Sequence, residues 1–148
     1  MAKLFLLLLV FGLGACGPMG RFPGGPLRGE VVEGPVESWA FTEDHKLIEL
    51  ETRPIFPHSV TTVCFTHEGQ LYIPSRNPRE KRWPRYVAED KHVRLRIGEK
   101  IYLGNALRVT HPRESDSLYE ALGRKYARLH TAGKAQRPEL WFYRIESR

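Results

Sequence analysis

The chain has 148 residues, of which 41% are hydrophobic and 27% are charged, and its formal net charge at pH 7 is +6. This length fits one domain with its own core, and the ordinary composition excludes a largely disordered chain. The positive charge favours anionic partners, such as phosphate groups, lipid head groups or nucleic acid, without choosing among them.

The first residues have the pattern of a secretion signal. Lys3 is followed by an almost unbroken apolar run from Leu4 to Leu13. A run of this length is too short to cross a bilayer as a helix, and it matches the core of a signal peptide. We therefore expect residues 1–15 to be a signal peptide.

The end of this segment resembles the lipobox of bacterial lipoproteins, in which cleavage precedes a Cys whose sulfur carries a diacylglycerol. The matching residues are Leu13, Gly14, Ala15 and Cys16. The resemblance implies that Cys16 is lipidated. The protein would then be a lipoprotein anchored to a membrane of the bacterial cell envelope, facing the periplasm or the exterior. An ordinary signal peptide with a Cys near its cleavage site is the alternative.

Gly and Pro dominate residues 17–29, which offer few side chains for a core. We therefore expect residues 16–26 to form the lipidated Cys and a tether, and residues 27–148 to form the single folded domain. If Cys16 is acylated, Cys64 has no disulfide partner. Its place within an apolar, β-branched stretch favours a buried, inert thiol over a nucleophile.

Alternating and β-branched patterns predict strands through the first half of the domain. The expected strands are 30–32, 37–41, 47–52, 58–66 and 70–73, the last two joined by a turn at 67–69. Residues 58–66 carry apolar side chains on both faces, so we expect a central strand there, and we expect Pro74 to close the strand at 70–73. Trp39 is predicted to lie in the core.

Helical signals follow. Asn77 as N-cap and Pro78 at the first position predict one helical turn, which Pro84 interrupts before a second short helix over residues 84–89. Pro112 opens the one long helix. Its apolar stripe is Leu118, Leu122, Tyr126 and Leu129, and Gly133 lies just beyond its end.

The remaining strands lie around the long helix. In residues 93–97, three apolar residues alternate with Arg94 and Arg96, which predicts a strand with one cationic face. A turn at 98–100 leads into a strand over 101–110, whose shared face is expected to carry Ile101, Leu103, Leu107 and Val109. The last expected strand, 139–145, carries aromatic residues for both of its faces.

This order of elements resembles the split β-barrel of the FMN-binding, pyridoxamine-phosphate-oxidase-like proteins and their deazaflavin-dependent nitroreductase relatives. The stretches that carry the resemblance are LYIPSRNPREKRW, VAEDKHVRLRI and IYLGNALRVTHPRE, and it covers residues 47–126. The implied fold is mainly β (α+β): a split β-barrel of about six to eight strands with one long and one short helix. The resemblance also implies a homodimer.

In such flavoproteins, the turn after the strand and the basic residues beyond it hold the cofactor phosphate. The resemblance therefore implies FMN or a deazaflavin as cofactor, with hydroxyl and cationic groups on its phosphate and an aromatic side chain beside its ring. The implied cofactor-binding residues are Thr61, Thr62, Ser75, Arg76, Lys81, Arg82 and Trp83.

The cations of residues 76–85 allow two interpretations. They form either a solvated surface that also suits anionic lipid, or a phosphate pocket; a lipoprotein is a poor setting for nucleic acid. The Gly-Arg-x-Ser-Gly element of the deazaflavin group is absent, and Lys81 lies six residues from Ser75 instead of at the usual Ser-x-Lys spacing. No metal-binding motif and no catalytic acid, base or nucleophile stands out.

Two functions therefore stay open. The first is a lipid-anchored envelope protein whose barrel is a ligand-binding or structural module of unknown ligand. The alternative is a flavin- or deazaflavin-dependent oxidoreductase of the nitroreductase-like type, in which the cofactor carries the chemistry and the protein orients it.

Overall fold

The computed structural model describes residues 17–127 and 137–148. The expected signal peptide, Cys16, and the expected helix residues Leu129 and Gly133 therefore lie outside the described residues. Among the described residues, none of the helices combines the length and the hydrophobicity of a membrane-spanning segment.

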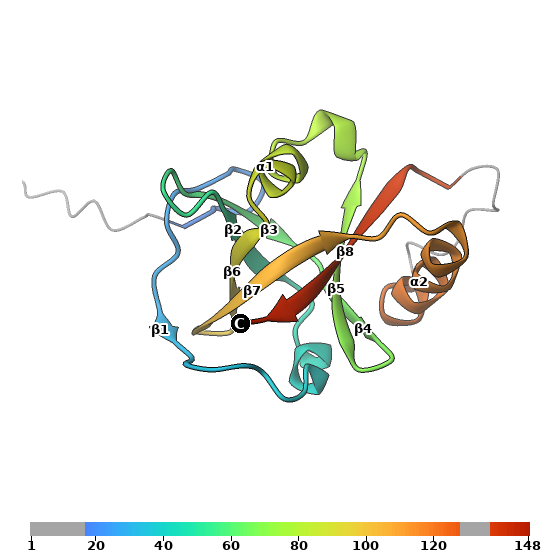
Figure 1. Cartoon of the computed structure of the whole chain (residues 1–148), viewed down its shortest axis with the longest axis horizontal. Helices are drawn as coiled ribbons and strands as arrows, with labels where there is room; N and C mark the ends of the chain where they lie inside the picture. The colour runs from blue at the N-terminus through green and yellow to red at the C-terminus, as the bar shows by residue number, and fades with distance from the viewer. Residues whose placement is uncertain (1–16, 128–136) are drawn as a thin grey trace, which may run out of the picture.

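The described residues fold into a mainly β structure with two α-helices (Figure 1). The strands are β1 (Glu30–Val31), β2 (Ile48–Thr52), β3 (His58–Thr62), β4 (Phe65–His67), β5 (Gln70–Arg76), β6 (His92–Ile97), β7 (Lys100–Arg108) and β8 (Leu140–Ser147). The α-helices are α1 (Trp83–Glu89) and α2 (Pro112–Lys125), and the 3₁₀ turns are η1 (Ala40–Asp44) and η2 (Pro78–Glu80).

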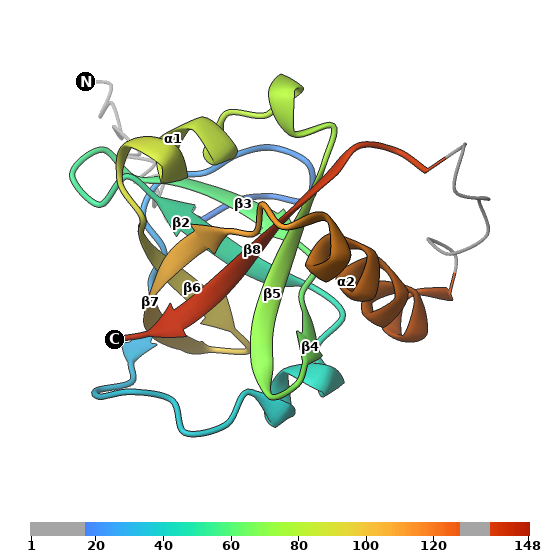
Figure 2. The same ribbon diagram turned by 45° about the vertical axis from the view of Figure 1, so that its right-hand side comes forward.

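One curled sheet holds the strands in the order β3-β2-β6-β7-β8-β5-β4, and β1 adds a parallel pair to β7. The two end strands of this order, β3 and β4, follow one another in the chain. The sheet therefore curls back on itself, with α1 over one end and α2 outside β4, β5 and β8 (Figure 2). This confirms the predicted α+β split barrel with one long and one short helix.

Two apolar clusters stabilise the fold, one on each face of the sheet. The inner cluster fills the barrel with side chains from β2, β5, β6, β7 and β8, and α1 adds Trp83 and Val87. The outer cluster packs Leu118 and Leu122 of α2 against the other face of the sheet. Consecutive residues of β8 divide between the clusters, because Tyr143 faces inward and Phe142 faces α2. The prediction that this strand serves both faces is confirmed.

The predicted shared face of β7 is the outer one. Ile101 and, just beyond the strand, Val109 are buried there, and Leu103 and Leu107 are partly buried. The face that packs into the barrel was not predicted: it carries Gly104 and Ala106, which are buried, with Tyr102. A side chain at position 104 would bring its Cβ within 2.9 Å of the Ile145 methyl group. Only small residues fit on this inner face of the curled sheet. A search for large apolar residues therefore could not find it.

The expected central strand over residues 58–66 is also not found. The chain breaks at Val63 and Cys64, so that β3 and β4 lie at opposite ends of the sheet order. Cys64 itself is fully buried, as predicted, and burial raises the pKa of its thiol to about 11.

The prediction that Pro74 ends its strand is wrong, since β5 continues to Arg76. Pro74 pairs with Phe142 of β8, while the pairing of β5 with β4 stops at Tyr72. At Pro74, β5 has no partner strand on the side of β4. A proline is tolerated there, because no backbone N–H has to donate to a neighbouring strand. The expected strand over 37–41 is instead a loop leading into η1, with Trp39 buried in the core as predicted.

The face of β6 that carries Arg94 and Arg96 is not a bare cationic surface. Arg94 pairs with Glu51 of β2, and Arg96 pairs with Glu49 of the same strand. The alternation of residues 93–97 is confirmed, with Val93, Leu95 and Ile97 buried in the barrel.

Candidate functional site

A cavity of about 590 Å³ lies beside β3, at the end of the barrel that α1 covers. Three segments surround it: β3, the connection from η2 into α1, and a loop near the start of the described chain. Its lining residues are Gly20, Arg21, Phe22, Pro23, His58, Val60, Thr61, Thr62, Glu80, Lys81, Arg82 and Trp83.

The connection from η2 into α1 supplies the cations. Lys81 ends η2 by donating its backbone N–H to the Pro78 carbonyl at 3.2 Å. The Arg82 carbonyl then accepts the backbone N–H groups of Arg85 and Tyr86 and begins α1. The side chain of Lys81 stays largely solvent accessible, yet partial burial of its ammonium, followed by the neighbouring Arg76, lowers its pKa. The negative charge of an anionic ligand would oppose this lowering, because it favours the protonated ammonium.

The strand β3 supplies hydroxyl groups and an imidazole. Thr61 and Thr62 are half-buried at its end, where they pair with β2. His58 at its start packs edge-on against Tyr86, with ring centroids 5.2 Å apart. Burial, followed by the charges of Arg82 and Arg53, lowers the pKa of His58. These effects favour the neutral imidazole.

The third wall is a small hairpin, residues 17–24, here called the N-terminal hairpin. Met19 and Phe22 exchange backbone hydrogen bonds of 3.2 and 3.0 Å across its turn. At its base, a Cβ on Gly24 would lie 2.3 Å from the Gly17 carbonyl carbon, so only glycine fits. Gly24 also exchanges two backbone hydrogen bonds with Ser59 of β3, at 2.8 and 2.9 Å. The segment expected to be a tether thus forms part of the cavity.

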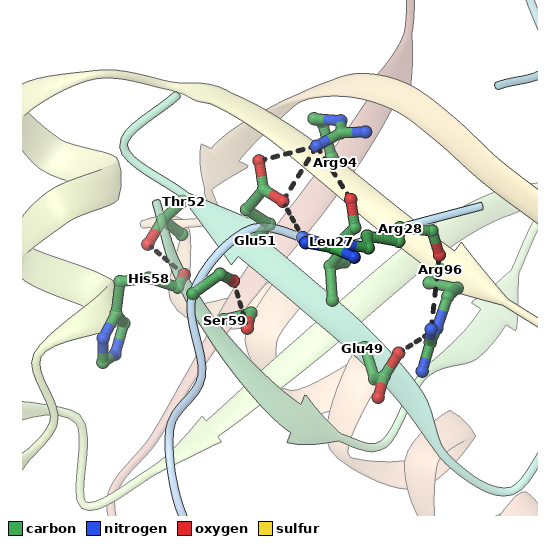
Figure 3. Close-up of polar contacts among 10 residues, drawn as sticks. Leu27, Arg28, Glu49, Glu51, Thr52, His58, Ser59, Arg94 and Arg96 are labelled. Carbon is green, nitrogen blue, oxygen red and sulfur yellow. Dashed lines mark hydrogen bonds and ion pairs between the residues drawn. The ribbon is translucent and has the colours of Figure 1, made fainter. Parts of the chain in front are cut away.

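Polar contacts continue this attachment along the chain (Figure 3). The Ser59 hydroxyl donates to the Gly25 carbonyl at 2.7 Å, and the Leu27 N–H donates to Glu51 at 2.5 Å. Glu51 is only 2% exposed and also accepts from Arg94. The wall that residues 20–23 form is therefore held in place by β2, β3 and β6.

A second cavity of about 280 Å³ adjoins the first and shares Thr61, Thr62 and Lys81 with it. It is more apolar and reaches the outer face of the sheet next to α2. Its other lining residues are Leu47, Val63, Pro74, Arg76, Tyr119, Leu122, Pro138 and Leu140.

The structure brings six of the seven candidate residues to these cavities. Thr61, Thr62, Lys81, Arg82 and Trp83 line the larger one, and Arg76 lines the smaller one. Most of the Trp83 side chain is in the core, where its ring centroid lies 4.8 Å from that of Tyr143, so little of its surface is left to contact a ligand.

Ser75 lines neither cavity. It lies on the barrel-facing side of β5 with Leu71 and Ile73, and its buried hydroxyl has no hydrogen-bond partner among the described residues.

Sequence reasoning missed His58 and the N-terminal hairpin. A Gly-Arg pair between Met19 and Phe22 is a hairpin-turn signal, with Gly20 at a φ of 59°. The surrounding Gly and Pro residues hid this signal, because the same composition is typical of a tether.

No protein-family model and no curated protein sequence matches the chain. Solved structures do resemble its fold. A Listeria innocua protein assigned as a pyridoxamine 5'-phosphate oxidase has a TM-score of 0.55 at 20% identity, over 73% of this chain and 88% of that chain. The conserved hypothetical protein Rv2991 of Mycobacterium tuberculosis has a TM-score of 0.58 at 15% identity, over 80% and 86%.

A third structure is a Bacteroides thetaiotaomicron protein assigned to 5-nitroimidazole antibiotic resistance, with a TM-score of 0.54 at 12% identity, over 76% and 82%. The chain has the fold of these proteins. At such low identity the likeness establishes the split barrel alone. The predicted resemblance to pyridoxamine-phosphate-oxidase-like and nitroreductase-like proteins is confirmed at the level of the fold.

Proposed function

We propose that this protein is a lipid-anchored ligand-binding module of the cell envelope, and that its larger cavity binds a phosphate-bearing ligand with a planar apolar part. The main observation behind this proposal is that one cavity is lined by Lys81, Arg82, Thr61 and Thr62. These segments are far apart in the chain, and only the fold brings them together.

The donor set suits a phosphate. Lys81 and Arg82 offer charged N–H donors, and the two threonines offer hydroxyl donors. The opposing charge within the cavity wall is Glu80. The cavity volume of about 590 Å³ lies within the range of small-molecule sites, so a ring system can accompany the anion.

FMN is the ligand we propose to test first. It joins a phosphate to a planar ring, and the Listeria protein of the same fold is assigned as a pyridoxamine 5'-phosphate oxidase. Lys81, Arg82 and the threonines would hold the phosphate, while the apolar cavity walls would exclude water from the ring. A bound flavin or deazaflavin supplies hydride transfer, which makes a nitroreductase-like oxidoreductase the second candidate function.

The matching experiment compares FMN with riboflavin, which lacks the phosphate, by fluorescence titration. The chain from residue 17 onward keeps every segment that lines the cavity. FMN should bind at least about tenfold more tightly than riboflavin, since two charge-assisted contacts depend on the phosphate. Equal affinity for FMN and riboflavin would contradict the phosphate site. If neither ligand bound, the flavin proposal itself would be contradicted.

The lipid anchor has its own test. Cys16→Ser should release the protein from membranes into the soluble fraction, because one covalent site carries all of the acyl chains. A Cys16→Ser protein that stays in the membrane pellet would contradict lipidation as the attachment. The homodimer that the resemblance implies stays a prediction. Light scattering would test it by measuring the oligomeric state in solution.

A further inference from the structure

Four large apolar side chains stand out from the surface at two loops. Phe22 and Met19 of the N-terminal hairpin are 74% and 67% exposed, and Ile55 and Phe56 of the loop between β2 and β3 are 85% and 70% exposed. We call these four residues the apolar rim. A soluble surface rarely leaves several large apolar side chains this bare in one region.

The two loops lie at the end of the barrel that α1 covers, the hairpin beside the start of that helix and the loop between β2 and β3 beside its last residues. The hairpin pairs with Ser59 through Gly24, and Ser59 follows Phe56 by only three residues. Both loops lie beside α1, away from the turn between β4 and β5 (Figures 1 and 2). Phe22 also lines the larger cavity, so the hairpin part of the apolar rim borders its opening.

Cations accompany the apolar rim. The Arg53 guanidinium lies 5.8 Å from the Phe56 ring and 4.5 Å from the Tyr86 ring. Arg21 lies at the tip of the hairpin, while Arg82 and Arg85 flank the start of α1. The acidic side chains nearby are Glu80 in the cavity wall and Glu89 and Asp90 beside Ile55 and Phe56. Cations outnumber acids at this end, which favours an anionic partner.

The place of Cys16 in the sequence favours a lipid bilayer as that partner. Gly17 forms the base of the hairpin, so an acylated Cys16 is covalently joined to the loop that carries Phe22. Phe22 lies six positions after Cys16, a reach of at most about 20 Å. A lipid-anchored chain therefore holds the apolar rim within reach of the head groups at a high effective concentration.

We propose that the apolar rim, with Arg21 and Arg53, docks on an anionic lipid bilayer, so that the larger cavity opens at the membrane surface. This inference rests on the lipid anchor proposed above. Exposed apolar side chains among arginines are what interfacial binding to anionic membranes requires.

The test places an environment-sensitive fluorophore on the full lipidated chain in vesicles. Ile55→Cys labelled with nitrobenzoxadiazole reports on the rim, and Glu68→Cys, at the turn between β4 and β5, is the matched control. Cys64 is buried and does not compete for the label. In vesicles of phosphatidylcholine with phosphatidylglycerol, emission from position 55 should shift to the blue while emission from position 68 stays as in water.

Substitutions of the two arginines beside the apolar rim test the docking without relying on a single labelled position. Arg21→Gln and Arg53→Gln should each weaken the docking equilibrium about fivefold at low salt. An unshifted emission at position 55 on vesicles that retain the protein would overturn docking and leave the anchor standing. Loss of the protein from the vesicles would instead contradict the anchor. A blue shift in native membranes but not in pure lipid would assign the rim to a protein partner, which also overturns the proposal.

Discussion

Glu51 and Arg94 form a buried ion pair that ties the start of the domain to the sheet. Arg94 of β6 donates to both carboxylate oxygens of Glu51, at 2.9 and 3.1 Å, and the Leu27 N–H donates to the same carboxylate. Arg94 also donates to the Leu27 carbonyl at 3.3 Å. One carboxylate therefore joins β2, β6 and the segment that leads to the N-terminal hairpin.

Removing this carboxylate should destabilise the protein. Glu51→Gln leaves the largely buried Arg94 without its counter-charge, so we expect the free energy of unfolding to fall by roughly 2 to 4 kcal/mol. Urea denaturation measures this change. The exposed pair of Arg79 and Glu139 is the matched control, since Glu139→Gln should cost less than about 1 kcal/mol. Equal losses for the two variants would contradict the structural role of Glu51.

The base of the N-terminal hairpin gives a second prediction. Gly24→Ala forces a Cβ against the backbone of Gly17, so the hairpin must open and the cavity must lose one wall. We expect a loss of about 1 to 3 kcal/mol in stability and a matching loss of ligand affinity. Gly17→Ala is the control, because its Cβ would meet Glu49 and Arg96 only at 3.8 and 3.9 Å. Hydrogen exchange at the Ser59 amide would reveal the opening directly.

Regular amphipathic patterns could be predicted from sequence. The alternation through Val93 and Leu95 predicted β6, and the stripe through Leu118 and Leu122 predicted the face of α2 that packs on the sheet. Each pattern follows from the period of one element and needs no knowledge of its neighbours.

Features set by distant contacts could not be predicted. The break at Val63 and Cys64 exists because β3 and β4 lie at opposite ends of a curled sheet, which no local pattern records. Gly104 is small because Ile145 lies against it. The cations of residues 76–85 were visible in the sequence, but the wall that faces them belongs to residues 20–23, whose composition is typical of a tether.

His58 gives a pH-dependent prediction. Burial, Arg82 and Arg53 lower its pKa in the folded state below the ordinary value of 6.5, so the unfolded chain binds its proton more readily. The stability that depends on neutral His58 is therefore complete above about pH 6.5 and is lost as the pH falls towards the folded-state pKa. Urea midpoints between pH 7.5 and 5 should show a shallower decline for His58→Gln than for the wild type. Identical slopes would contradict this role.

Cys64 should be chemically silent in the folded protein. Burial raises its pKa to about 11, so only about a thousandth of the thiol is ionised at pH 8, and the side chain is fully buried. In the chain from residue 17 onward, iodoacetamide should react only after urea unfolds the protein. Rapid labelling under native conditions would show that the segment between β3 and β4 opens readily.

The proposed phosphate site is tested most directly by a fluorescence titration with FMN of the chain from residue 17 onward, repeated with Lys81→Ala, Arg82→Ala and Arg79→Ala. Arg79 is the control, because it pairs with Glu139 and lines neither cavity. We predict that each of the first two substitutions weakens binding by roughly 1 to 3 kcal/mol, while Arg79→Ala leaves it within about 0.5 kcal/mol. FMN binding that survives both Lys81→Ala and Arg82→Ala, or that is absent from the wild type, would contradict the assignment of this cavity.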